Sequence, residues 1–150
     1  MTASTVGIDA SAVMLEVARP HVHARLVEAD LRLLPLDTGS QHLTWACASL
    51  LHLPKQQLPA ALAEARRVLA PGGALALTMK AGTTEGFELN HSETRAEPRF
   101  FARYEAGELA ATLEQVEFSR VSVSPPATDE RGETWLHALA RAPDEPAARR

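Results

Sequence analysis

Apolar runs alternate along the chain with segments whose apolar positions repeat at helical spacing. The runs predict strands at residues 5–8, 25–29, 43–48 and 74–79. The third run is apolar at consecutive positions, which is typical of a strand buried on both faces. The fourth has the same character and is typical of a central parallel strand.

Helical spacing predicts three helices. The first has Ser11 as its N-cap and ends before Pro20. The second, at residues 58–69, carries a single apolar stripe and is stopped by the turn Pro71-Gly72-Gly73. The third extends over about residues 106–116.

The polar stretch at residues 80–104 has no convincing period, so we expect a long loop with a functional role there. A shorter loop is expected at residues 31–39. Two strands, at residues 119–124 and 134–140, follow the last helix and predict an antiparallel pair at the edge of the sheet.

This alternation of strands and helices predicts an α/β fold with a doubly wound, mostly parallel sheet. The chain of 150 residues is 45% hydrophobic and 23% charged, which suits one globular domain. We place this domain at residues 1–142 and expect a solvated, disordered tail at 143–150.

Charge and cysteine content exclude several classes of function. A net charge of -4 leaves no basic face, so nucleic acid is not an expected partner. Cys47 is the only cysteine and lies in an apolar run, which predicts a buried, inert thiol and no disulfide. There is no apolar run long enough for a membrane span and no secretory signal, so the expected compartment is the cytoplasm.

The candidate chemistry lies at the ends of the first three strands. Asp9 and Asp30 follow the first two strands, and Ala48 ends the third. Ligands of such sheets bind at this edge, where carboxylates can accept hydrogen bonds from ribose hydroxyls and an adenine amino group. The alternative is that each acid only caps the helix or turn that follows it. Two acids at consecutive strand ends favour the nucleotide site.

The order and spacing of five segments resemble the class I S-adenosylmethionine-dependent methyltransferases, in particular small-molecule members of types 11 and 25. The similarity covers nearly the whole chain, and no single motif decides it. The segments are Val6-Gly7-Ile8-Asp9-Ala10-Ser11, Val27-Glu28-Ala29-Asp30-Leu31 with Leu34-Pro35-Leu36, Ala48-Ser49-Leu50-Leu51-His52-Leu53-Pro54, the stretch from Ala65 through Pro71-Gly72-Gly73 to Leu75, and Phe100-Phe101-Ala102-Arg103-Tyr104.

The resemblance implies a Rossmann-like fold, S-adenosylmethionine as the cofactor and a small molecule as the methyl acceptor. It implies that Asp9 binds the ribose hydroxyls with Ala10 beside it, and that Asp30 accepts from the adenine amino group. The amide of Leu31 would meet the adenine ring, and Ala48 would line the floor near the methionine portion. Methyl transfer depends mainly on holding the acceptor close and in line, so a dedicated base is optional.

One part of the family pattern has no counterpart. The family's first strand and glycine-rich turn are missing, and residues 1–4 cannot supply them, so we expect an N-terminally truncated domain. The missing strand belongs at the centre of the sheet, between the strands predicted at residues 5–8 and 43–48. Its loss leaves two strand edges without partners. The strands close up, another chain fills the gap, or the chain is a fragment. We expect a fragment or a mis-set start. We also expect weak or no cofactor binding by this chain alone and possible self-association through these edges.

Other functions and residues are weighed against this prediction. A non-catalytic, degenerate relative that acts in binding or assembly is the main alternative; a piece of a nicotinamide-dependent dehydrogenase would explain Asp9 but not Asp30. His52 is a weak candidate for a catalytic base, and it could equally pack at a helix start. His91 belongs, with Phe87, Phe101 and Tyr104, to the segment that would cover the acceptor, or to an ordinary anchored loop. No metal site is predicted, and Trp45 and Trp135 are expected in the core.

Overall fold

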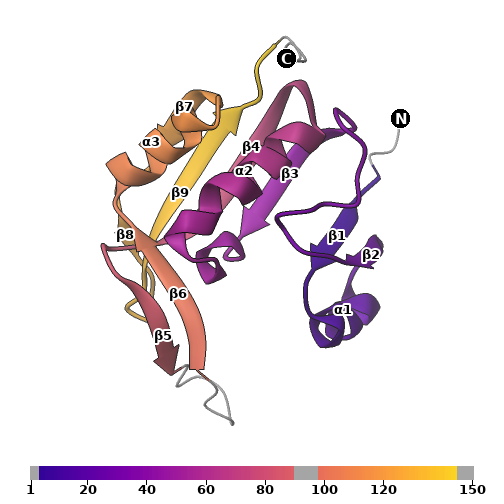
Figure 1. Cartoon of the computed structure of the whole chain (residues 1–150). Helices are drawn as coiled ribbons and strands as arrows, with labels where there is room; N and C mark the ends of the chain where they lie inside the picture. Colours follow the sequence, from indigo (N-terminus) through magenta and orange to yellow (C-terminus); the bar gives the residue numbers. More distant parts are fainter. Residues whose placement is uncertain (1–3, 90–97, 145–150) are drawn as a thin grey trace.

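The strands form two separate sheets in the computed structural model, which describes residues 4–89 and 98–144 (Figure 1). The smaller sheet contains the parallel strands β1 (Val6–Asp9) and β2 (Arg25–Glu28). Helix α1 (Ala12–Ala18) and a short 3-10 helix (Arg19–His21) connect them. Ser11 caps α1 as predicted, because its side chain accepts a hydrogen bond from the Met14 amide at 3.3 Å.

The larger sheet has seven strands and is organised around β4 (Leu69–Ala81). Strand β3 (Gln41–Cys47) runs parallel to β4 on one edge, and β9 (Thr134–Arg141) runs antiparallel on the other. Beyond β9 lies β7 (Ser119–Val123), so the predicted antiparallel pair forms the carboxyl-terminal edge. The α/β class and its Rossmann-like arrangement are confirmed. The remaining strands are β5 (Glu85–Leu89), β6 (Pro98–Tyr104) and β8 (Ala127–Thr128).

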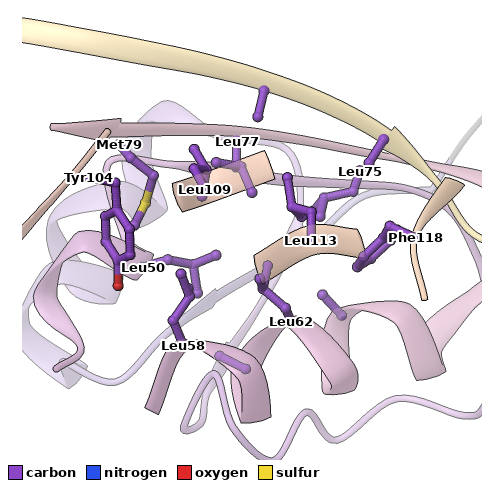
Figure 2. Packing of buried hydrophobic residues seen from close by; sticks show 14 of the residues in the cluster. Leu50, Leu58, Leu62, Leu75, Leu77, Met79, Tyr104, Leu109, Leu113 and Phe118 are labelled. Carbon is purple, nitrogen blue, oxygen red and sulfur yellow. The ribbon is translucent and has the colours of Figure 1, made fainter. Parts of the chain in front are cut away.

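Helices α2 (Leu58–Val68) and α3 (Ala106–Gln115) cover one face of the larger sheet (Figure 1). Every second residue of β4 points into this layer, and Leu75, Leu77 and Met79 are at most 2% exposed. They pack with leucines of both helices, as Figure 2 shows. The stripe predicted for the second helix is confirmed, because all but one of its positions fall in α2 and are buried.

The opposite face of the larger sheet is open. Leu43 and Trp45 on β3 are 60% and 72% exposed, and Leu139 on β9 is 61% exposed. Cys47, the next outward position of β3, is also exposed. The prediction of a strand buried on both faces, with Trp45 in the core and a buried Cys47 thiol, is therefore wrong. The physical reason is that no helix within the described residues packs on this face of β3.

The predicted loop at residues 80–104 contains a β-hairpin instead. Strands β5 and β6 pair antiparallel in register from Glu85↔Ala102 to Leu89↔Pro98. The rings of Phe87 and Phe100 meet edge to face at 5.4 Å, which is the cross-strand pairing that stabilises hairpins. Phe101 and Tyr104 belong to the core, and His91 lies outside the described residues.

Strands β1 and β3 do not close up into one sheet. In the described part of the chain, β1 pairs only with β2 and β3 pairs only with β4. No described helix is long and apolar enough to cross a membrane. Of the predicted tail, Pro143 still contacts β4 by accepting a hydrogen bond from the Gly72 amide at 3.1 Å, and residues 145–150 lie outside the described residues.

Candidate functional site

The residues expected to bind the cofactor lie at the carboxyl ends of β1, β2 and β3. Asp9 is the last residue of β1 and pairs in register with Glu28 of β2. The carbonyl of Asp9 also accepts a hydrogen bond from the Ala29 amide at 3.1 Å, so the chain that leads to Asp30 is held beside Asp9. Ala48 directly follows β3, on the other sheet.

Asp9 combines a capping role with a free acceptor. Its Oδ1 atom accepts a hydrogen bond from the Ser11 amide at 2.8 Å, which fixes the turn into α1. Oδ2 has no hydrogen-bond partner among the described residues. Asp9 is half-buried and Ala10 is exposed, so a ligand can approach this turn. Capping and ligand binding are therefore compatible at Asp9.

Asp30 is already occupied by a neighbouring cation. Its Oδ1 accepts from the Arg32 amide at 2.8 Å and from Arg32 Nε at 2.9 Å, while Oδ2 forms an ion pair with the same guanidinium. These hydrogen bonds from Arg32 lower the pKa of Asp30 from 3.8 to about 2. Arg32 is also held by Gln57 Oε1 at 2.7 Å. An adenine amino group could reach Asp30 only by sharing or displacing Arg32.

Leu31 begins a loop that α2 holds in place. The Leu31 amide has no acceptor among the described residues, and its side chain packs against the core. Arg67 donates to the carbonyls of Leu34 and Leu36 at 3.0 and 2.9 Å. Glu64 accepts from the Leu34 amide at 2.8 Å and pairs with Arg67, whose hydrogen bonds lower the pKa of Glu64. The loop that carries Leu31 is thus positioned by side chains of a helix.

Ala48 adopts a left-handed backbone conformation, with φ of 48°. Residues other than glycine rarely adopt it, and such strain concentrates at binding and active sites. The Ala48 amide donates to Thr78 Oγ1 of β4 at 2.8 Å, which stabilises this turn. The strain marks the end of β3 as a feature that the local sequence would not adopt on its own.

His52 lies in the short 3-10 helix Leu50–His52 and is exposed. Its Nδ1 atom is 2.8 Å from the carbonyl oxygen of Phe100, and its ring packs against Phe101 with centroids 4.9 Å apart. Because a carbonyl can only accept, Nδ1 carries the proton in this hydrogen bond. Nε2 of the neutral ring then keeps its lone pair, which is the arrangement a base needs.

Sequence reasoning missed Lys80, a buried cation beside the ring that packs against His52. Lys80, near the end of β4, is 8% exposed, pairs with Glu133 at 2.9 Å and lies 4.2 Å above the Phe101 ring. A lysine at the end of an apolar strand was the only available signal.

Tyr104 is not a candidate base. Burial raises its pKa, and its hydroxyl has no hydrogen-bond partner among the described residues, so Tyr104 stays protonated.

Comparisons with known proteins bear on the family and the fold. Residues 1–73 match the family model of a methyltransferase domain. No curated protein sequence matches the chain. Among solved structures, an S-adenosylmethionine-dependent methyltransferase from Methanosarcina mazei superposes with a TM-score of 0.76 and 16% identity, covering 95% of this chain and 83% of that one.

Two further structures add ligand and partner information about themselves. The 1,6-didemethyltoxoflavin-N1-methyltransferase of Burkholderia thailandensis, solved with bound 1,6-didemethyltoxoflavin and S-adenosylhomocysteine, gives a TM-score of 0.67 and 18% identity over 93% of this chain and 61% of its own. The complex between the Haloferax volcanii Trm112 methyltransferase activator and a putative methyltransferase gives a TM-score of 0.68 and 16% identity. The match covers 95% of this chain and 73% of that one. The match of residues 1–73 to a methyltransferase domain and the fold shared with these S-adenosylmethionine-dependent methyltransferases both agree with the resemblance found in the sequence.

Proposed function

We propose that the chain binds S-adenosylmethionine at the carboxyl ends of β1, β2 and β3 and serves methyl transfer to a small-molecule acceptor. The observation that carries the proposal is the hydrogen-bonded register of β1 and β2, which brings the Asp9 and Asp30 turns side by side. The cofactor is supported by the methyltransferase relatives, one of which contains S-adenosylhomocysteine. The small-molecule acceptor is supported by that same relative.

The residues present fit the adenosine portion of this cofactor in part. Oδ2 of Asp9 is free to accept from ribose hydroxyls, and the Leu31 amide is free to donate to the adenine ring. Asp30 fits less well because Arg32 occupies both of its oxygens. That ion pair is exposed, so exchanging it for a ligand hydrogen bond in water has a small cost.

We further propose that this chain alone binds the cofactor weakly. Asp9 and Asp30 belong to the small sheet, whereas Ala48 belongs to the large one, and no backbone hydrogen bond joins β1 to β3 in the described residues. A cofactor that contacts both sheets must therefore fix the position of one sheet relative to the other when it binds. Ordering of this kind reduces affinity, since the free energy of binding must cover it.

For the transfer itself, the bound cofactor supplies a methyl group on a sulfonium, which an acceptor's lone pair attacks in line. His52 is the residue we propose as the proton acceptor. Its Nε2 is left free by the Nδ1 hydrogen bond to Phe100, and its ring orientation is held by Phe101. A base of this kind contributes modestly, by about 10²- to 10⁴-fold, so positioning remains the larger requirement.

Calorimetry with S-adenosylhomocysteine tests the binding proposal. We expect weak binding, with a dissociation constant of roughly 0.1–1 mM for the unaltered chain. Asp9→Asn should abolish it, and Arg32→Ala should tighten it by releasing Asp30. Glu16→Gln, an exposed change on α1, is the matched control and should leave it unchanged. Micromolar binding would contradict the weak affinity, and binding insensitive to Asp9 would contradict the site.

A second function is favoured by a separate observation. The open face of the larger sheet, with Leu43, Trp45 and Leu139 more than half exposed, suits a non-catalytic domain that acts in binding or assembly. The Trm112 complex shows a related fold bound to a protein activator. Absence of any S-adenosylhomocysteine binding, together with binding of a protein partner at this face, would favour this function over methyl transfer.

A further inference from the structure

Strand β5 is an outer strand of the larger sheet. It lies at one end of the row β5-β6-β4-β9-β7, and β6 is its only partner strand in the part of the chain that the structure describes (Figure 1). At the other end of the row, β7 is interrupted by a register shift and by Arg120, whose φ is 50°. Irregularities of this kind protect an edge from pairing with another strand. The register of β5 with β6 is continuous instead, and β5 contains neither lysine nor proline.

One hydrogen bond identifies the backbone groups on the outer edge of β5. The Arg103 amide donates to the Thr84 carbonyl at 2.9 Å, so these two residues form a hydrogen-bonded pair of the antiparallel ladder. Hydrogen-bonded pairs alternate with pairs that are not hydrogen-bonded. In the register of β5 and β6, Glu85, Phe87 and Leu89 therefore turn their amide and carbonyl groups away from β6. This edge offers a donor and an acceptor at every second residue.

The side chains of β5 give this edge an apolar face. Phe87 and Leu89 project from the same face of the strand and are 75% and 53% exposed. Phe100 of β6 lies beside Phe87, with the ring centroids 5.4 Å apart. On the opposite face of the hairpin, the charge of Glu88 is neutralised by an ion pair with Arg103. A strand added at this edge would therefore gain both a ladder of hydrogen bonds and apolar contacts.

The sequence of β5 is complementary to itself in antiparallel orientation. When two copies pair with Phe87 on the two-fold axis, Glu85 of each lies opposite Leu89 of the other. Gly86 then lies opposite Glu88, so no two carboxylates face each other. The two Phe87 rings meet at the axis, and all the outward backbone groups of both strands find partners. A shift of the axis to Glu88 would place two carboxylates opposite each other, which is destabilising.

We infer that β5 pairs antiparallel with β5 of a second copy of this chain, with Phe87 on the two-fold axis, and so joins two larger sheets into one. A second copy suits this edge because it supplies the same donors, acceptors and apolar side chains in the complementary order. The contact is short compared with a permanent dimer interface, so the association is reversible and depends on concentration. This goes beyond the proposed function and does not depend on cofactor binding.

Sedimentation equilibrium over a range of protein concentrations tests for this dimer. We expect the mass to rise reversibly from that of one chain towards that of two at concentrations below about 1 mM. Phe87→Lys places two ammonium groups at the axis and should weaken association by about tenfold or more. Val13→Lys is the matched control, because Val13 on α1 is 69% exposed, and it should leave association unchanged. A chain that stays monomeric throughout, or equal effects of the two lysines, would overturn the inference.

Cysteine cross-linking tests the register, in a Cys47→Ser background because Cys47 is exposed. In the inferred register, the two Cα atoms at position 87 are about 5.5 Å apart, a separation that a disulfide can span. The two Cα atoms at position 89 are about 14 Å apart, which is too far. Under mild oxidation, Phe87→Cys should therefore form a disulfide-linked dimer much faster than Leu89→Cys. Equal rates, or a faster reaction at position 89, would overturn the inference.

Discussion

The two parts of this chain differ sharply in how they are held. From Leu50 onward, more than twenty apolar residues are buried around the layer between β4, α2 and α3. Before Leu50, the only buried apolar residue among those described is Leu15. The residues that we assign to the cofactor lie almost entirely in this thinly packed part, so the scaffold and the site have different sources of stability.

The amino-terminal part is held mainly by polar contacts. The side chains of Glu64 and Arg67 bind the loop at residues 31–39, and Arg32 bridges Asp30 to Gln57. Helix α1 leaves Val13, Met14 and Val17 between 52% and 69% exposed, so it contributes little burial. Hydrogen bonds of this kind add less net free energy than a dry core, so this part should open first.

The largest expected effect comes from the closed face of the sheet. Leu62→Ala removes a side chain that is 0% exposed, and we expect it to lower the free energy of unfolding by about 2–5 kcal/mol because a cavity remains. Leu43→Ala, the same chemical change on the open face, should cost less than about 0.5 kcal/mol. Urea denaturation of both variants measures the contrast, and similar losses would contradict it.

A second prediction concerns local opening in the unaltered chain. Amides of β4 should exchange with solvent only on global unfolding, whereas those of β1 and β2 should exchange through openings that are a few kcal/mol easier. Hydrogen exchange over a range of urea concentrations measures both. If β2 amides showed the same urea dependence as those of β4, the chain would be one cooperative unit and the comparison would fail.

These differences explain what the sequence could predict. The cap at Ser11 and the stripe of α2 are local features, determined by a hydroxyl at one position and by apolar spacing. The exposure of Trp45 is not determined by the local sequence. An apolar strand is able to be buried, but whether it is buried depends on other elements packing against it. The β5–β6 hairpin was missed because the sequence of β5, Glu-Gly-Phe-Glu-Leu, is not strongly typical of a strand. Pairing with β6 stabilises it as one.

The site was predicted in the same uneven way. Asp9 and Asp30 could be placed at strand ends from the apolar runs that precede them. The occupation of Asp30 by Arg32 depends on the geometry of a tight turn and on Gln57, 25 residues away, so spacing could not reveal it. The strain at Ala48 is a property of the backbone and leaves no trace in residue type.

A smaller loss of unfolding free energy is expected when the loop at residues 31–39 loses its hydrogen bonds from Arg67. Arg67→Ala leaves the carbonyls of Leu34 and Leu36 without their donor, and it should cost about 1–3 kcal/mol of unfolding free energy. Hydrogen exchange should also accelerate in residues 31–39. Arg66→Ala is the matched control: its partner Glu117 is 68% exposed, so the change should cost less than about 1 kcal/mol. An unaltered loop in the Arg67 variant would show that the loop is held by other contacts.

The smallest expected effect is the pH dependence that Glu64 contributes to the free energy of unfolding. Its pKa lies below the ordinary value of 4.5, chiefly through the hydrogen bonds from Arg67, so the ionised form stabilises the fold. This contribution is complete above pH 4.5 and is lost as the pH falls through the lowered pKa of the folded state. Because other carboxylates titrate in the same pH range, the effect of Glu64 is measured as the difference in unfolding free energy between the unaltered chain and Glu64→Gln. The free energy of unfolding of the unaltered chain should exceed that of Glu64→Gln near neutral pH, and the gap should shrink in acid. A gap that stayed constant with pH would mean that the charge of Glu64 does not hold the loop, and that the amino-terminal part depends on packing more than its exposure suggests.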